Sequence, residues 1–339
     1  MQDILKKLIA SQDLTSEEAA RAMTTIMTGE AGEAQTAAFL TALAMKRETP
    51  VEIEGFARSM RKAAVTWKSN PLETVVDTCG TGGDGQNTIN VSTLSALVLA
   101  AAGLKVAKHG NRAVSSATGS ADLLETLGVS LTVQSPEALA HCIEKAGIAF
   151  LFAQAWHPAM KHAGPVRRAL GFRTVFNILG PLTNPAPVTH QLVGVFDPRF
   201  LEPVAKTLLN LGRTVAYVLH ADDGLDEISP AASTRYFQIK EGRIESGTFT
   251  AADFGFKSFP LGAIVVKDRD EAVARARAIL SGKGSDEENA AVAMNAAPLY
   301  HATFGGDLKS AAGACIEIIK NGKAGGTLEQ WKQISSDKS

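Results

Sequence analysis

Cysteine is scarce in this sequence. The 339 residues include only three cysteines, Cys79, Cys142 and Cys315, which lie far apart along the chain. An odd number at such spacing fits neither a disulfide framework nor a zinc site. The scarcity therefore excludes a small secreted domain held together by disulfides, and we expect the protein to work in a reducing cytoplasm.

The sequence also lacks an excess of either charge and any long apolar run. Lys and Arg together number 34 and Asp and Glu 35, so no overall basic field draws the protein to nucleic acid or anionic lipid. The longest apolar run, near residues 97–102, is far shorter than the roughly 20 residues that a membrane span needs. A basic region followed by an apolar run is missing after Met1, so we expect no signal peptide. We therefore expect a soluble protein with no nucleic-acid or membrane partner.

What the sequence does contain is a change of pattern after its first fifth. Residues 1 to about 66 have helical patterns throughout, among them a capping box at Thr15 and Glu18. The segment Lys68–Pro71 is typical of a linker, and beyond it strands and helices alternate. This arrangement predicts an α/β fold class, with a small all-helical domain over 1–68 and a large α/β domain whose mostly parallel sheet is flanked by helices.

The large domain is expected to contain six strands, a hairpin and further helices. The strands are expected near residues 74–77, 104–107, 130–133, 148–152, 192–196 and 214–219. The hairpin is expected over 235–249, with its turn at Glu241 and Gly242, and helices from about 270 to about 332. A helix start is also expected at Ser135, because Pro136 and an acid follow it.

One stretch breaks this alternation. A helix is expected to begin at His157 and end near Gly171, and 175–185 fits either an awkward strand or a short helix. We therefore predict that about 166–186 joins the helical domain. The large domain would then comprise 69–165 and 187–339.

The most informative stretch is 77–93, DTCGTGGDGQNTINVST, which lies between an expected strand and an apolar helix. Its glycines, Gly80, Gly82, Gly83 and Gly85, allow positive φ and can turn several backbone N–H groups toward one point. The loop is longer than the two to six residues of an ordinary connection. A phosphate or diphosphate site is therefore favoured over a surface turn.

The same glycines also satisfy the G-x-G-x-x-G pattern of dinucleotide-binding folds. That reading requires an acidic residue about twenty residues later, at the end of the second strand. The strand expected over 104–107 is followed instead by the basic and polar residues Lys108, His109 and Gly110. The required context is missing, so we favour a phosphate cradle over an NAD site.

A second polar cluster covers residues 108–122. Because it follows the second strand, it should emerge at the same carboxyl edge of a parallel sheet as the glycine loop. Lys108 supplies positive charge, and Ser115, Ser116 and Ser120 supply hydroxyl donors that suit a phosphate monoester, although a solvated loop is the alternative. A lone histidine is more often structural than catalytic, so His109 is assigned to substrate positioning rather than proton transfer.

A third cluster contains acids, at residues 222–227. In a loop, Asp226 and Glu227 can turn toward one place, and two carboxylates beside a diphosphate suggest Mg²⁺. The alternative is an acidic surface turn, but the position after a strand favours metal. Arg167 and Arg168 lie on the helix that begins near His157, and Arg168 is expected to be solvated.

Together these motifs resemble the anthranilate phosphoribosyltransferase family over almost the whole chain. The matching motifs are DTCGTGGDG at 77–85, N-x-S-T at 90–93, KHGNR at 108–112, SS at 115–116, GSAD at 119–122, VRRALG at 166–171, FNILGPLTNP at 176–185 and DGLDE at 223–227. The resemblance implies a nucleoside phosphorylase-like fold, commonly a homodimer through the helical domains. It also implies metal-dependent transfer of phosphoribose from 5-phosphoribosyl 1-diphosphate to anthranilate in tryptophan biosynthesis.

The resemblance further implies residue roles. The residues that would hold 5-phosphoribosyl 1-diphosphate are Gly80, Gly82, Gly83, Asp84, Thr88, Asn90, Val91, Ser92, Thr93, Lys108, Asn111, Ser115, Ser116 and Ser120. Those that would line the anthranilate path are Gly80, His109, Asn111, Arg167 and Pro181, with Arg167 facing the carboxylate. Two Mg²⁺ ions would be bound by Ser92, Asp226 and Glu227.

The implied chemistry needs no residue as nucleophile, acid or base, because diphosphate leaves readily and an aromatic amine is already nucleophilic. Two alternatives remain open. A pyrimidine nucleoside phosphorylase has a similar fold, but it has no diphosphate for Asp226 and Glu227 to hold through metal. A non-catalytic nucleic-acid-binding relative is disfavoured by the near-neutral charge.

Overall fold

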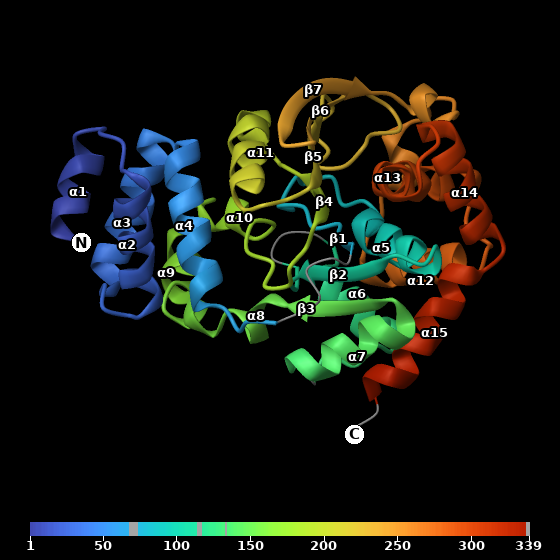
Figure 1. Ribbon diagram of the computed structural model, residues 1–339, viewed down its shortest axis with the longest axis horizontal. Helices are drawn as coiled ribbons and strands as arrows, with labels where there is room; N and C mark the ends of the chain where they lie inside the picture. The colour runs from blue at the N-terminus through green and yellow to red at the C-terminus, as the bar shows by residue number, and fades with distance from the viewer. Residues whose placement is uncertain (68–73, 114–116, 133, 337–339) are drawn as a thin grey trace.

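The computed structural model describes residues 1–67, 74–113, 117–132 and 134–336. A helical N-terminal part lies beside a larger part that is built around a sheet (Figure 1). The linker predicted at Lys68–Pro71 lies outside the described residues. Within the described ranges, no helix combines the length and the apolar character needed to cross a membrane.

The N-terminal part is formed by α1 (Gln2–Ile9), α2 (Ser16–Met27), α3 (Glu33–Lys46) and α4 (Pro50–Ala63). The predicted capping box is confirmed, because the Thr15 hydroxyl accepts the Glu18 N–H and the Glu18 carboxylate accepts the Thr15 N–H. A second capping box joins Thr49 and Glu52 at the start of α4. The two boxes fix where these helices begin.

The larger part contains one seven-stranded sheet with strand order β3-β2-β1-β4-β5-β6-β7. The strands are β1 (Val75–Asp77), β2 (Lys105–Gly110), β3 (Ile148–Phe152), β4 (His190–Gly194), β5 (Val215–Ala221), β6 (Thr234–Lys240) and β7 (Arg243–Phe249). The pairs among β1 to β5 are parallel, and β6 and β7 are added antiparallel. The structure thus confirms the mostly parallel sheet and the hairpin.

Helices cover both faces of this sheet. The α-helices that follow α4 along the chain, of which α9 and α10 pack against the N-terminal helices, are α5 (Val91–Ala101), α6 (Ser120–Leu127), α7 (Pro136–Ala146), α8 (Ala153–Trp156), α9 (Gly164–Leu170), α10 (Phe176–Leu179), α11 (Leu201–Asn210), α12 (Arg269–Leu280), α13 (Asp286–Phe304), α14 (Leu308–Lys320) and α15 (Lys323–Ser336). Short 3₁₀ helices are η1 (Pro158–Lys161), η2 (Pro198–Phe200), η3 (Ala251–Phe254) and η4 (Leu261–Ile264). The expected cap at Ser135 is confirmed, since its hydroxyl accepts the Ala138 N–H.

The structure differs from the expectations at two places. The strand predicted near 130–133 is wrong for its described residues, 130–132, which are irregular. The Ser130 N–H is satisfied by the Ser335 hydroxyl of α15 rather than by a neighbouring strand. The helix predicted from His157 to Gly171 is divided into η1 and α9, and Pro165 lies in the first turn of α9.

The segment 175–185, which the sequence analysis assigned to either an awkward strand or a short helix, contains the helix α10. Its side chains share an apolar cluster with the N-terminal helices, and the same cluster continues through α11 to one face of β4 and β5. A second cluster packs α5 and the C-terminal helices against the other face. This packing agrees with joining 166–186 to the helical part, and the domain boundaries themselves stay a prediction.

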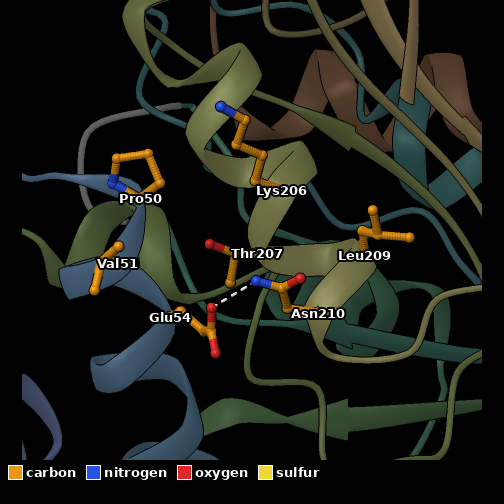
Figure 2. A pocket seen from close by; sticks show the side chains of 7 residues that line it. All are labelled: Pro50, Val51, Glu54, Lys206, Thr207, Leu209 and Asn210. Carbon is orange, nitrogen blue, oxygen red and sulfur yellow. Dashed lines mark hydrogen bonds between the residues drawn. The ribbon is translucent and has the colours of Figure 1, made fainter. Parts of the chain in front are cut away.

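The helical part meets the larger part where α4 lies against α11 (Figure 2). The side chain of Asn210 donates a hydrogen bond of 2.6 Å to the Glu54 carboxylate across this junction. A cavity of about 240 Å³ lies there, lined by Pro50, Val51, Glu54, Lys206, Thr207, Leu209 and Asn210. Since the end of α11 leads into the start of β5, this cavity lies away from the carboxyl ends of the strands.

Candidate active site

The sheet has a topological switch point between β1 and β4. The chain runs outward from β1 to β3 on one side and then from β4 to β5 on the other. Ligands of open parallel sheets bind outside the carboxyl ends of the strands at such a point. The glycine loop follows β1 and the acidic turn 222–227 follows β5, so both lie at this edge.

The glycine loop and the acidic turn are in direct contact. The Gly82 N–H donates to Asp226 Oδ2 at 2.8 Å, and the Ser92 N–H donates to Glu227 Oε1 at 3.1 Å. Gly82 has φ of +64° and Gly83 of +79°, as the glycine-rich pattern predicts. These amides point at negatively charged oxygens, which is the orientation that an anion site requires.

The acids at this edge repel one another. Burial, together with the Asp84 charge, raises the pKa of Asp226 to about 7, and burial with the Asp226 charge raises the pKa of Glu227 well above its usual value. Glu227 Oε2 is buried and has no hydrogen-bond partner among the described residues. A bound cation would offset both the repulsion between the acids and the missing hydrogen bond of Glu227 Oε2.

The donor set fits Mg²⁺, which prefers carboxylate oxygen and usually binds one or two carboxylates plus substrate phosphate. Among the residues that the structure describes, no group of three or more His, Cys, Asp or Glu side chains could hold a metal ion by itself.

Close packing at the end of β4 holds the acidic turn in place. A Cβ atom added to Gly194 would lie 1.4 Å from the Asp226 carbonyl oxygen, and one added to Gly80 would lie 3.2 Å from Asp226 Oδ2. The Thr81 N–H also donates to the Gly194 carbonyl at 2.9 Å. The sequence analysis missed Gly194, although a glycine inside a strand pattern is a signal of close backbone approach.

Lys108 lies beneath the glycine loop. The strand β2 continues three residues beyond its expected end at 107, so Lys108 and His109 are strand residues. The Lys108 side chain is 1 % exposed, and its ammonium donates to the Thr78 carbonyl at 2.8 Å and to the Ser92 hydroxyl at 3.4 Å. It therefore places a buried positive charge directly under the residues predicted to bind diphosphate and metal.

His109 is neutral in this environment. Its Nδ1 lies 3.0 Å from the Gly180 carbonyl oxygen, which can only accept, so Nδ1 carries the proton and Nε2 is an acceptor. Burial, with the nearby His157, lowers the His109 pKa to about 3. Nε2 is buried without a partner among the described residues, which suits contact with a substrate N–H.

We expect acid to destabilise the fold because of two buried histidines. His109 and His157 are each 3 % exposed, and burial lowers their pKa values to about 3 and about 4. Below about pH 6.5 the unfolded chain binds protons that the folded chain does not, so each histidine lowers the free energy of unfolding by up to about 1.4 kcal/mol per pH unit. Urea denaturation should show that the free energy of unfolding falls less between pH 6.5 and pH 4.5 in His157→Gln than in the wild type.

Asp77 changes the free energy of unfolding in the opposite direction as the pH falls. Burial raises its pKa to about 6, so the folded chain binds a proton at a higher pH than the unfolded chain does. That contribution is common to the wild type and to His157→Gln, so it cancels in the comparison. Equal slopes for the two proteins would show that His157 is protonated in the folded state.

The anthranilate residues are only partly brought together. The contact of His109 with Gly180 places β2 beside Pro181, whose carbonyl accepts the Gln191 side chain at 2.7 Å. Arg167 is half-buried with its guanidinium 5.3 Å from the centre of the Phe176 ring, and burial lowers its pKa. Within the described ranges, no recorded hydrogen bond or ion pair joins Arg167 to the other residues of the path.

Asn111 is exposed, and its side-chain oxygen accepts the Arg112 N–H at 2.8 Å and the Gln154 amide at 3.4 Å. It lies just beyond the end of β2, on the same segment as His109. Its exposed position leaves it accessible to a substrate at this edge.

The remaining residues predicted to bind phosphate lie next to the glycine loop. Val91, Ser92 and Thr93 form the first turn of α5, where backbone N–H groups and the helix dipole favour an anion. Asn90 donates to the Thr118 carbonyl at 3.1 Å, and Thr88 bridges to Val265.

Ser120 begins α6, after the turn at Gly119. It therefore lies at the start of a helix that follows the 108–122 cluster along the chain. Ser115 and Ser116 lie outside the described residues, so their predicted roles stay predictions.

A buried polar network under β1 was missed from the sequence. The Asp77 carboxylate accepts hydrogen bonds from the Asn184 amide at 2.8 Å, the Gln191 amide at 3.2 Å and the His109 N–H at 3.2 Å. Arg213 donates to Gln191 at 2.9 Å behind it. These contacts join β1, β2 and β4 to the 176–185 segment, which fixes the base of the site.

Comparisons with known proteins agree with this geometry. Residues 2–64 match the helical bundle domain of a glycosyl transferase family, and residues 72–325 match the a/b domain of that family. The chain is 44% identical over 330 residues to the anthranilate phosphoribosyltransferase of Clostridium kluyveri, covering 97% of this chain and 98% of that protein.

Solved structures are similar over the same extent. The anthranilate phosphoribosyltransferase of Thermus thermophilus superposes with a TM-score of 0.91 at 41% identity, covering 99% of this chain and 100% of that one. The Saccharomyces cerevisiae enzyme in complex with PRPP and Mg also gives 0.91, at 28% identity, covering 99% of this chain and 97% of that one.

Proposed function

The chain belongs to the anthranilate phosphoribosyltransferase family, and from this premise we propose which of its residues carry out the reaction. The reaction transfers the phosphoribosyl group from 5-phosphoribosyl 1-diphosphate to the amino group of anthranilate. Its products are N-(5-phosphoribosyl)anthranilate and diphosphate, in a step of tryptophan biosynthesis.

The glycine loop binds the diphosphate. The observation that carries this assignment is the convergence of loop amides, the α5 N-terminus and the buried Lys108 at the switch point of the sheet. The loop residues Gly80, Gly82, Gly83 and Asp84 face the diphosphate, and Thr88 to Thr93 continue the site into α5. Lys108, Asn111, Ser115, Ser116 and Ser120 hold the ribose and its 5-phosphate.

The enzyme uses Mg²⁺, and Asp226, Glu227 and Ser92 hold two ions beside the diphosphate. The partnerless Glu227 oxygen and the raised pKa values of both carboxyls support this assignment. When bound, the ions neutralise charge that develops on the diphosphate as it leaves. Lys108, 3.4 Å from the Ser92 hydroxyl, contributes further positive charge from below.

Anthranilate binds on the side of His109, Asn111, Arg167 and Pro181. The partly buried Arg167 faces its carboxylate, and the neutral His109 presents Nε2 as an acceptor to the amine. The amine nitrogen bonds to the ribose carbon as the bond from that carbon to diphosphate breaks, and the amine then loses a proton to solvent water. The site supplies position and charge stabilisation, and no side chain acts as nucleophile or general base.

We further propose a homodimer formed through the helical part, working in the cytoplasm and without nucleic-acid or membrane partners. The large apolar side chains that the helical part exposes most are Ile9 at 77% and Met45 at 81%. Cys79, Cys142 and Cys315 are free and buried, which suits a reducing compartment. Sedimentation at twice the mass of one chain is the measurement for the dimer.

The activity assay tests the function directly. Purified protein mixed with 5-phosphoribosyl 1-diphosphate, anthranilate and Mg²⁺ should consume anthranilate, seen as loss of its fluorescence. The loss should require both substrates and stop with EDTA, because the diphosphate then lacks its counter-ions. If anthranilate is not consumed but thymidine or uridine is cleaved with inorganic phosphate, the protein is a nucleoside phosphorylase instead.

A further inference from the structure

Arg173 makes contacts at the glycine loop that the family motifs do not assign. It follows α9 and the left-handed residue Gly171, which turns the chain back toward the sheet. Its Nη2 donates a hydrogen bond to the carbonyl of Gly83. A Cβ atom on Gly83 would lie 3.7 Å from Nη2, so the guanidinium covers this glycine at contact distance.

An aromatic ring holds the Arg173 side chain in this position. The guanidinium carbon lies 4.3 Å from the centre of the Phe196 ring, in the loop after β4. The Phe196 N–H in turn donates to the Thr81 hydroxyl at 3.0 Å. The arginine and its platform therefore contact the glycine loop at two separate points, although Arg173 itself is exposed.

The contacted carbonyl controls the orientation of a binding-loop amide. In a trans peptide the Gly83 C=O and the Asp84 N–H point in opposite directions, and no cis peptide is present in the described residues. A donor that fixes the carbonyl therefore fixes the Asp84 amide. The Asp84 carboxylate in turn accepts the Asp226 N–H at 3.5 Å and the Gln86 N–H at 3.0 Å.

We propose that Arg173 is a positioning residue that holds the Gly83–Asp84 peptide in the orientation that binds the diphosphate of 5-phosphoribosyl 1-diphosphate. The proposal rests on the proposed function. Gly83, with φ of +79°, precedes this peptide and Gly85, with φ of +78°, follows Asp84, so the backbone here is permissive and an external donor can select one orientation of the peptide. Arg173 and Arg167 also lie on one segment, which links the two substrate sites along the chain.

The test compares four variants with the wild type. Arg173→Gln removes the charge and replaces the guanidinium with a shorter amide donor, Arg173→Lys keeps the charge and N–H donors but loses the planar guanidinium, and Phe196→Leu removes the aromatic platform. Arg168→Gln is the matched control, because Arg168 is an exposed arginine of the preceding helix. For each we would measure kcat, the KM of both substrates, the Kd of the Mg²⁺ complex of 5-phosphoribosyl 1-diphosphate and the unfolding midpoint.

Arg173→Gln should raise the KM and Kd for 5-phosphoribosyl 1-diphosphate about 10-fold, change the anthranilate KM less than about 2-fold and leave the unfolding midpoint unchanged. Arg173→Lys should show a smaller rise in the KM and Kd for 5-phosphoribosyl 1-diphosphate than Arg173→Gln. Phe196→Leu should raise the KM for 5-phosphoribosyl 1-diphosphate about 3-fold. Arg168→Gln should match the wild type.

Three outcomes would overturn the proposal: Arg173→Gln behaving like Arg168→Gln, both KM values rising equally with a lower unfolding midpoint, or full recovery in Arg173→Lys. A wild-type protein that transfers no phosphoribose would instead remove the proposed function. The wild-type assay therefore separates a failure of this proposal from a failure of the function.

Discussion

Asp226→Asn should reduce Mg²⁺-dependent turnover by at least about 100-fold while leaving the protein folded. The Asp226 carboxylate accepts the Gly82 N–H and stands beside Glu227, so it joins the anion loop to the proposed metal site. Asparagine can keep the hydrogen bond, but it removes the charge that holds the metal. The measurement is steady-state turnover over a range of Mg²⁺ concentrations.

The same variant should be at least as stable as the wild type at neutral pH without metal. Burial raises the Asp226 pKa to about 7, so ionising this carboxyl costs free energy in the folded protein, and asparagine avoids that cost. Asp222→Asn is the control, since Asp222 lies in the same turn but is 52% exposed and pairs with Arg235. Near-normal turnover of Asp226→Asn would remove the metal assignment.

The loops of the candidate site could be predicted from the sequence because their signals are local. Glycines with positive φ, a capping box and acids after a strand each depend on a few neighbouring residues. The parallel sheet then brings the glycine loop and the acidic turn to one edge, as the contact of Gly82 with Asp226 shows. The alternation of strands and helices was enough to expect that edge.

The residues that the sequence did not reveal act through distant partners. Gly194 matters because the Asp226 backbone packs on it, and Arg173 because it meets Gly83, which lies 90 residues earlier. Residues 130–132 were expected in a strand, yet the Ser130 N–H is satisfied by the Ser335 hydroxyl of α15. Such pairings depend on tertiary packing, which no pattern within a short window contains.

Gly194→Ala should abolish most activity although Gly194 touches no substrate in the proposed mechanism. Its Cβ would lie 1.4 Å from the Asp226 carbonyl oxygen, and backbone on both sides leaves no flexible side chain to yield. The φ of Gly194 is not in the left-handed region, so the steric contact alone requires glycine here. We expect a loss of unfolding free energy of about 1–3 kcal/mol, typical of overpacking, with turnover reduced at least about 100-fold.

A matched glycine separates this effect from a general effect of the substitution. Gly313 lies in α14, where an added Cβ meets no atom within 4 Å, so Gly313→Ala should raise stability by about 0.5–1 kcal/mol and keep full activity. Because the displaced turn carries Asp226 and Glu227, Gly194→Ala should also bind Mg²⁺ more weakly. Its remaining turnover should therefore need a higher Mg²⁺ concentration than that of the wild type. Wild-type Mg²⁺ dependence and turnover in Gly194→Ala would show that the turn is not held by this contact, and the proposed origin of its geometry would be wrong.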